Sequence, residues 1–366
     1  MIKDESGSKS KIKVIVYGAS GYTAGELLRL LQQHPLVEIV GVVSNSQAGA
    51  TLSSMHPHLG DEIGSLKTIT AASLPACDCI FFATPPGVAM GKVADLLAKG
   101  VKVIDLSPDF RIKNVELWQK WYGMQHSQPQ LVSDAVYGLP EANRAALRNP
   151  GLRLIANPGC YATAVQLSLL PLVSNPAYKK VLESNELVVD AKSGVSGAGK
   201  QAVERLLLGE AGEDFTCYAA SGHRHQPEME ESLRDASDVR VKLRFTPHLL
   251  PISRGIFSDV YVPIISAGVS GDAVDVNSVR AEYESFYKDH PFVKVLPHSV
   301  APRVKSVRGS NFCHIGIFVA EGSKYVVICA VIDNLVKGAA GQAIQNMNLV
   351  FAFGETTGLT QTGLAP

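Results

Sequence analysis

The segment that most constrains the fold is residues 13–31, where a short β-branched run leads through Gly18-Ala-Ser-Gly21 into a stretch with apolar residues at helical spacing. A strand, a glycine turn and a helix in this order predict the first unit of a parallel sheet. Alternating strands and helices with right-handed crossovers form an α/β Rossmann-type dinucleotide-binding domain. The sequence predicts that alternation to continue, with strands at 37–43, 79–83 and 101–106 and a helix at 88–99.

The pattern changes after a predicted helix at about 160–173. Few helices separate the strands predicted beyond it, and this predicts an α+β domain with a mostly antiparallel sheet. The last predicted helix, at about 338–353, is apolar on one side. We therefore predict a dinucleotide-binding domain over 12–157, with the C-terminal segment 334–366 packing back on it, and a substrate and dimerisation domain over 158–333. The strands predicted in the second domain lie at 186–192, 239–246, 258–265, 314–320 and 325–332.

Composition excludes several classes of protein. The chain has 34 basic and 34 acidic residues, without the basic excess that nucleic acid or an anionic membrane would require. No apolar run is long enough to span a bilayer. The six cysteines are scattered without a C-x-x-C pair, which predicts neither a disulfide framework nor a metal site. We expect a small-molecule substrate and a cytoplasmic protein, or one of the plastid stroma if the source is a plant.

The glycine turn has the spacing G-x-x-G-x-x-A between a strand and a helix. Glycines allow the backbone to approach a pyrophosphate, and the N–H groups and dipole of the helix favour the anion. A plain tight turn is the alternative, but the flanking strand and helix favour a cofactor loop. Its candidate cofactor-binding residues are Gly18, Ser20, Gly21, Tyr22 and Thr23.

The end of the second predicted strand bears on the choice of cofactor. NAD-binding folds usually have an acid there, which binds the ribose 2′-hydroxyl. Here the strand is followed by Ser44-Asn45-Ser46 without an acid. Hydroxyl and amide groups can donate to a 2′-phosphate that a carboxylate would repel, so the sequence favours NADP(H) over NAD.

Cys160 follows an Asn157-Pro-Gly turn at the predicted start of a helix. A free thiol has a pKa of about 8.5, and a helix N-terminus or a nearby imidazole lowers it. A buried structural cysteine is the alternative, and we assign that role to Cys77, Cys79, Cys313 and Cys329. For Cys160 the preceding turn favours a nucleophile.

Two histidines and a carboxylate, His223, His225 and Glu228, lie within six residues. Imidazole can exchange protons near neutral pH, and a carboxylate can set its tautomer. A solvated turn and a metal site are the alternatives, but no further Cys or His cluster supports a metal. We predict that this motif supplies the acid or base for Cys160.

Two more regions have the composition of ligand sites. Residues 190–200 form a Gly/Ser-rich loop directly after a buried strand, where the backbone can approach a ligand closely. Arg111, in S-P-D-F-R, and Arg254, in P-I-S-R-G, are candidates for binding an anionic substrate, because guanidinium matches carboxylate and phosphate.

Seven motifs together resemble the N-acetyl-γ-glutamyl-phosphate reductase family, which is related to aspartate-semialdehyde dehydrogenase. The resemblance runs from about residue 13 to the C-terminus. One departure is Thr84-Pro-Pro-Gly, where the family often has Leu-Pro-His-Gly. The motifs are GASGYT (18–23), SPDFR (107–111), ANPGCYAT (156–163), DAKSGVSGAG (190–199), GHRHQPE (222–228), PISRG (251–255) and DNLVKGAAGQAIQNMN (333–348).

The resemblance implies that an acyl phosphate is reduced with NADPH through a thioester on Cys160. It also implies that a histidine oriented by Glu228 handles the proton, and that Arg111 and Arg254 bind the phosphate and the α-carboxylate. Further substrate-binding residues are then Asn157, Ser193 and Gly194. Further cofactor-binding residues are Ser44, Asn45, Thr84, Pro85, Ser107, Ser196, Gly197, Ala198 and Asn334.

Alternative functions remain open at this point. The same chemistry on aminoadipyl phosphate, in lysine biosynthesis, differs by one methylene, which is worth only about 1–3 kcal/mol in a pocket. A non-catalytic NADP-binding regulator would need no nucleophile, and a cysteine hydrolase would need no dinucleotide loop. The resemblance also implies a homo-oligomer, a dimer or a tetramer.

Overall fold

The computed structural model describes residues 11–201, 203–263, 276–321 and 323–365. The chain folds into two compact units. One comprises the residues up to Pro158 together with Ala339–Thr360, and the other comprises Gly159–Gly338 together with the residues after Thr360. Residues 264 and 265 of the strand predicted at 258–265 lie outside the described residues.

The first unit contains a six-stranded sheet in which every neighbouring pair is parallel, in the order β2-β1-β3-β4-β6-β5. This confirms the predicted Rossmann-type fold. The two strands that were not predicted, β5 and β6, have only two and three residues. The strands are β1 (Ile12–Tyr17), β2 (Val37–Val43), β3 (Cys79–Phe82), β4 (Lys102–Asp105), β5 (Val136–Tyr137) and β6 (Leu154–Ala156).

Helices pack against both faces of this sheet, which explains why β3 is buried at every position. On one face, Ile15, Phe82 and Val103 pack with the apolar sides of α4 and α5 in one core cluster. Elsewhere in the unit, α12 packs against α1 and α6. The predicted helices at 88–99 and 338–353 are shorter than expected, and a π-helix (Val336–Ala340) precedes the second. The helices are α1 (Tyr22–Leu31), α2 (Leu52–Met55), α3 (Asp61–Gly64), α4 (Val93–Ala98), α5 (Val115–Tyr122), α6 (Pro140–Leu147) and α12 (Gly341–Val350).

The second unit contains a seven-stranded mixed sheet in the order β11-β12-β13-β10-β7-β9-β8. Only the β11–β12 and β7–β9 pairs are parallel, so the predicted mostly antiparallel sheet is confirmed. The strands are β7 (Glu186–Gly194), β8 (Thr216–Cys217), β9 (Lys242–Leu250), β10 (Ile256–Pro263), β11 (Val293–Val295), β12 (Cys313–Phe318) and β13 (Tyr325–Ile332).

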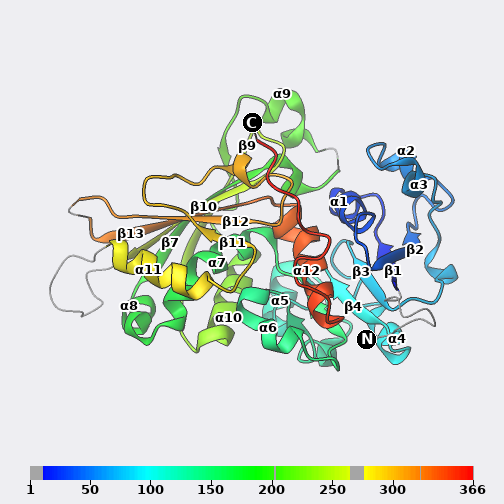
Figure 1. Ribbon diagram of the computed structural model, residues 1–366, viewed down its shortest axis with the longest axis horizontal. Coiled ribbons are helices and arrows are strands. Elements are labelled where there is room, and N and C mark those ends of the chain that lie inside the picture. The colour runs from blue at the N-terminus through cyan, green and yellow to red at the C-terminus, as the bar shows by residue number, and fades with distance from the viewer. Residues whose placement is uncertain (1–10, 202, 264–275, 322, 366) are drawn as a thin grey trace. The chain divides into compact units, whose positions relative to one another are not determined.

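One face of this sheet is covered by helices. Figure 1 shows α7, α10 and α11 on the same side of it, and the side chains of β10 alternate between buried and half-buried positions accordingly. The central helix, α7, is buried on almost every side. The expectation of few helices in this unit was wrong for α10 and α11. The helices are α7 (Cys160–Ser174), α8 (Lys179–Ser184), α9 (Leu208–Ala211), α10 (His225–Ser237) and α11 (Val276–Tyr287).

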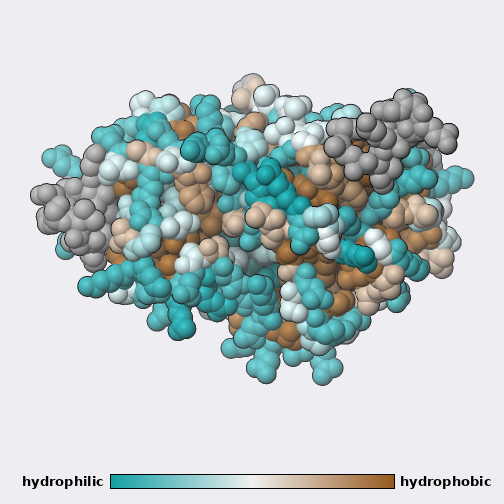
Figure 2. All heavy atoms as spheres, turned by 60° about the horizontal axis from the view of Figure 1, so that its bottom comes forward, coloured by the Kyte–Doolittle hydropathy of each residue, from teal (hydrophilic) through white to brown (hydrophobic). Residues whose placement is uncertain are grey.

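In the part of the chain that the structure describes, no helix combines the length and the apolar character needed to cross a membrane. The face drawn in Figure 2 carries hydrophilic and hydrophobic residues side by side.

Candidate active site

The loop between β1 and α1 passes close to the end of β3, and this requires glycine at position 18. Gly18 has a φ of +103°, and a Cβ there would lie 2.3 Å from the carbonyl oxygen of Ala83. The N–H groups of Gly18 and Ala19 donate to the carbonyl oxygen of Val43, each at 3.0 Å. The loop is therefore held at the carboxyl edge of three adjacent strands, where open α/β sheets bind ligands.

Helix α1 begins at this loop with Gly21 as its extended N-cap residue, which offers no side-chain cap. The N–H groups of a first turn without a side-chain cap are donors for an anion. Ser20, Tyr22 and Thr23 flank this position, and Ser20 and Tyr22 are exposed. These features fit the pyrophosphate of a dinucleotide.

His56, which was not predicted as a site residue, supports the loop. It is buried, and its Nε2–H donates to the carbonyl oxygen of Ala19 at 2.6 Å. A Cβ on Gly25 would come within 2.6 Å of the ring nitrogen Nδ1 of His56. The glycine after Ala24 is thus explained by a histidine 31 positions away.

The predicted cofactor residues at the other strand ends differ in exposure. Ser44 is buried and its hydroxyl accepts from the N–H of Gln47 at 3.2 Å, whereas Asn45 is exposed. Thr84 lies next to Gly18, because its Cγ2 would be 3.1 Å from a Cβ at that glycine. Pro85, the next residue, is exposed.

Ser107 belongs to a buried polar network at the end of β4. Its hydroxyl donates to Asp105 at 2.8 Å, and burial, followed by the charge of Asp109, raises the pKa of Asp105. The carboxylate of Asp109 accepts from the N–H groups of Gly87 and Met90, at 2.9–3.1 Å. Asp109, which was not predicted as a site residue, therefore connects the S-P-D-F-R segment to the loop after β3.

Arg111 and Asn157 also lie in the first unit. Arg111 donates to the carbonyl oxygen of Leu106 at 2.6 Å. Asn157 is fully buried, where its amide donates to the carbonyl oxygen of Ala339 and its Oδ1 accepts from Asn346.

Cys160 is the first residue of α7, as predicted, and Gly159 is the extended N-cap residue. Glu228, at 1% exposure, accepts from the N–H of Gly159 at 2.8 Å. A Cβ on Gly338 would lie 2.8 Å from the Cβ of Cys160. Two contacts that the sequence pattern did not predict therefore position the thiol: one carboxylate in front of the helix and one glycine beside it.

A cavity of about 370 Å³, which we call the catalytic cavity, opens beside Cys160. It brings together five predicted catalytic or substrate residues: Cys160, His223, His225, Ser193 and Gly194. Gly197 and Ala198 also line it. Other lining residues that were not predicted include Tyr161, Arg205, Tyr218 and Arg224. A thiol and two imidazoles thus share one cavity.

His223 is enclosed by aromatic rings and held in one orientation. The rings of His225, Phe245, Tyr161 and Tyr218 have centroids 4.8–5.9 Å from its own. Its Nδ1 accepts from the backbone N–H of His225 at 3.1 Å, so the neutral ring carries its proton on Nε2. Burial, followed by the charge of Arg224, lowers the pKa of His223 to about 4.

The two tyrosines in the cavity are hydrogen-bonded to each other. Tyr218 donates to the hydroxyl of Tyr161 at 3.1 Å, and Tyr161 donates to the carbonyl oxygen of His248 at 3.1 Å. Burial raises the pKa of Tyr161, so this phenol stays protonated. The pair forms a fixed polar wall beside His223.

Ser196, Arg254 and Asn334 do not line the catalytic cavity. The side chain of Asn334 accepts from the N–H of Gly255 at 2.7 Å and donates to Ser196 Oγ at 3.0 Å. Arg254 lies 3.5 Å from the buried carboxylate of Asp333. Among the described residues, no group of three or more His, Cys, Asp or Glu side chains could hold a metal ion.

A parallel dinucleotide-type unit joined to a mixed-sheet unit with a cysteine and histidine cavity defines a two-domain dehydrogenase. Family models agree: "Semialdehyde dehydrogenase, NAD binding domain" matches residues 13–150, and "Semialdehyde dehydrogenase, dimerisation domain" matches residues 160–334. The N-acetyl-γ-glutamyl-phosphate reductase of Thiobacillus denitrificans is 49% identical over 97% of this chain and 100% of its own length. The chain therefore belongs to the N-acetyl-γ-glutamyl-phosphate reductase family of semialdehyde dehydrogenases.

Solved structures show the same fold at low sequence identity. Aspartate semialdehyde dehydrogenase II of Vibrio cholerae, complexed with ASA, has a TM-score of 0.69 at 16% identity, and 94% of this chain and 99% of that one are covered. Aspartate semialdehyde dehydrogenase of Candida albicans with NADP has a TM-score of 0.67 at 16% identity, with coverage of 94% and 99%.

Proposed function

We propose that the protein reduces N-acetyl-L-glutamyl 5-phosphate to N-acetyl-L-glutamate 5-semialdehyde, with release of phosphate, as a step of arginine biosynthesis. The observation that carries the proposal is the position of Cys160 at the start of α7, in one cavity with His223 and His225. The full-length relatives named for this reaction support the substrate.

In the first chemical step the sulfur of Cys160 attacks the acyl carbon, and the carbon–oxygen bond to phosphate breaks. His225 takes the thiol proton and passes it to the departing phosphate. The product is a thioester on Cys160.

When bound, NADPH would supply the hydride that reduces the thioester. His223 donates a hydrogen bond from Nε2 to the oxygen that becomes negative in the tetrahedral intermediate, because its lowered pKa keeps the ring neutral. The intermediate then collapses to the aldehyde and the thiolate, which takes up a proton from water. In this mechanism His223 stabilises the oxyanion, and His225 accepts the proton of the Cys160 thiol.

NADP(H) is the proposed cofactor because no acid follows β2, where Ser44 and the exposed Asn45 stand. The turn at Gly18 and the uncapped start of α1 would hold the pyrophosphate. Ser196, Gly197, Ala198 and Asn334 stay predicted nicotinamide contacts. The description of the second domain as a dimerisation domain supports a homo-oligomer, and the bacterial relatives support a cytoplasmic location.

The test is the reverse reaction: phosphate-dependent reduction of NADP⁺ with N-acetylglutamate 5-semialdehyde. Cys160→Ser is expected to abolish turnover while NADP⁺ binding, measured by fluorescence titration, is kept. Cys313→Ser is the matched control, because Cys313 is a fully buried thiol in β12. Undiminished turnover in Cys160→Ser, or equal wild-type rates on the aminoadipate homologue, would contradict the proposal.

A further inference from the structure

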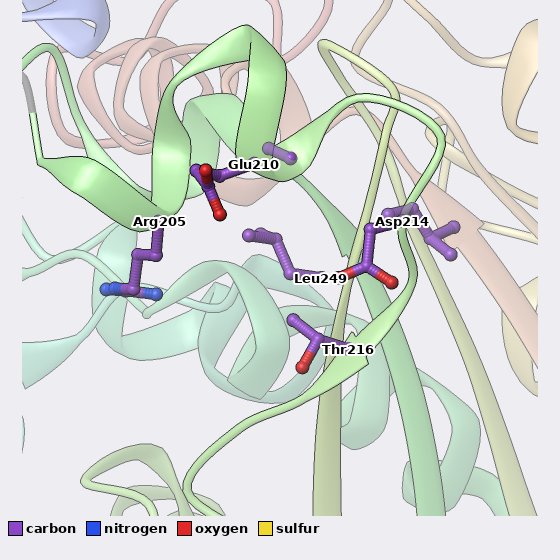
Figure 3. Close-up of a pocket in the computed structure, with 7 residues that line it drawn as sticks. Arg205, Glu210, Asp214, Thr216 and Leu249 are labelled. Carbon is purple, nitrogen blue, oxygen red and sulfur yellow. The ribbon is translucent and has the colours of Figure 1, made fainter.

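A second cavity adjoins the catalytic cavity in the second unit. This side cavity, of about 180 Å³, shares two lining residues with the catalytic cavity, Arg205 and Leu249. Figure 3 shows Arg205, Glu210, Asp214, Thr216 and Leu249 around it. Cys160 borders only the catalytic cavity, so the side cavity lies beyond the reacting group.

Arg205 is exposed, and within the described residues it makes no ion pair or hydrogen bond, although Glu210 and Asp214 border the same side cavity. Its charge reaches into the catalytic cavity. Burial raises the pKa of Tyr218, and the guanidinium groups of Arg205 and Arg224 act in the opposite direction. Arg205 is thus a cation at the boundary between the two cavities.

Two arginines line the catalytic cavity, and they lie near different parts of it. Arg224 is next to His223, whose pKa it lowers, and therefore belongs to the reacting end. Arg205 belongs to the end that opens into the side cavity. Arg254, which was predicted from the sequence to bind an anion, lies 3.5 Å from the buried carboxylate of Asp333 and does not line this cavity.

We propose that Arg205 binds the α-carboxylate of the substrate and that the side cavity receives its acetamido group. The inference rests on the proposed function, because it assigns the remote end of that same substrate. It makes Arg205 a specificity residue that selects substrates with an α-carboxylate, while the side cavity selects those with an N-acyl group.

The charges and groups of the side cavity favour this orientation. The acyl phosphate must lie at Cys160, and the carboxylates of Glu210 and Asp214 would repel a phosphate from the side cavity. An amide N–H can donate to either carboxylate. The hydroxyl of Thr216 donates to the carbonyl oxygen of Cys217 at 3.4 Å and can rotate to donate to the amide oxygen. Leu249 offers apolar surface to the methyl group.

The experiment combines the loss of the guanidinium group in the protein with the loss of the carboxylate in the substrate. Arg205→Met is compared with wild type on N-acetylglutamate 5-semialdehyde and on 4-acetamidobutanal, which has the same chain and acetamido group but no carboxylate. A charge-assisted hydrogen bond predicts a fall in kcat/KM of about 10- to 100-fold on the first aldehyde only. The loss appears in the KM for the aldehyde, with KM for phosphate and NADP⁺ unchanged. Arg205→Lys keeps the positive charge, so its kcat/KM on N-acetylglutamate 5-semialdehyde should fall less than that of Arg205→Met.

The control is Arg234→Met, on the exposed side of α10, which leaves all constants unchanged. An equal effect of Arg205→Met on both aldehydes, no effect on either, or a raised KM for phosphate would overturn the assignment. Wild-type protein that fails to turn over N-acetylglutamate 5-semialdehyde would instead overturn the proposed function, so the two failures are distinguishable.

Discussion

Replacing His223 should remove a measurable part of the acid sensitivity of the fold. Burial lowers the pKa of this ring from an ordinary value of 6.5 to about 4. As the pH falls, the unfolded chain therefore binds a proton at this site before the folded chain does. The stability that the neutral ring contributes is present above pH 6.5 and is lost as the pH falls from 6.5 towards 4.

The size of the effect follows from the two pKa values. The complete difference corresponds to about 3 kcal/mol, at 1.36 kcal/mol for each pKa unit. Between pH 7 and pH 5 only part of the transition is crossed, and linkage gives a loss of about 2 kcal/mol. His223→Asn abolishes the titration, and the Asn side-chain oxygen can still accept from the N–H of His225.

The measurement is urea-induced unfolding at pH 7, 6 and 5, at one protein concentration because the protein is expected to be oligomeric. Between pH 7 and pH 5 the wild type should lose about 2 kcal/mol more than His223→Asn. Burial also lowers the pKa values of His34 and His314, so only the difference between the two proteins isolates His223. His298→Asn, at an exposed position, should follow the wild type. Identical pH dependence in wild type and His223→Asn would refute the reasoning.

Three further substitutions test the loop and the nucleophile. Gly18→Ala should weaken NADP⁺ binding and cost about 1–3 kcal/mol of stability from the positive φ alone. Gly60→Ala is the control, because a Cβ added at Gly60 meets no atom within 4 Å. This control should leave both the NADP⁺ titration and the urea midpoint unchanged. Glu228→Gln should lower the free energy of unfolding by about 1–2 kcal/mol, because a charge-assisted bond to the N-cap of α7 becomes a neutral one; an unchanged midpoint would contradict that role. Gly338→Ala should slow alkylation of Cys160 by iodoacetamide together with turnover, since the added methyl meets the Cβ of that cysteine; normal alkylation would show that the crowding is relieved elsewhere.

Local patterns in the sequence were sufficient to predict the main strands and helices of the first unit. The strand, turn and helix at 12–31 have their apolar spacing and glycines within one short segment, and Cys160 begins α7 as the Pro-Gly turn predicts. Propensity and periodicity act over such distances. Helix α10 was missed because it begins inside the histidine motif, at His225, and its mean polarity hides the periodicity.

The contacts that complete the site could not be predicted from local sequence patterns. Glu228 meets Gly159, 69 positions away, and the ring of His56 excludes a side chain at Gly25. Glu228 was singled out in the sequence only as a partner of the histidines, and no local pattern pairs it with Gly159 or pairs His56 with Gly25. Their roles exist only when the chain brings them together.

The sequence by itself determined the fold class, the glycine loop at 18–21 and the position of Cys160 at the start of a helix, because each depends on residues that are neighbours in the chain. The tertiary structure decided which arginines share a cavity with Cys160. Arg205 and Arg224 line it, whereas Arg254, equally plausible in sequence, lies against Asp333. The physical reason is that a guanidinium group selects its anion by proximity in space, which no local spacing encodes.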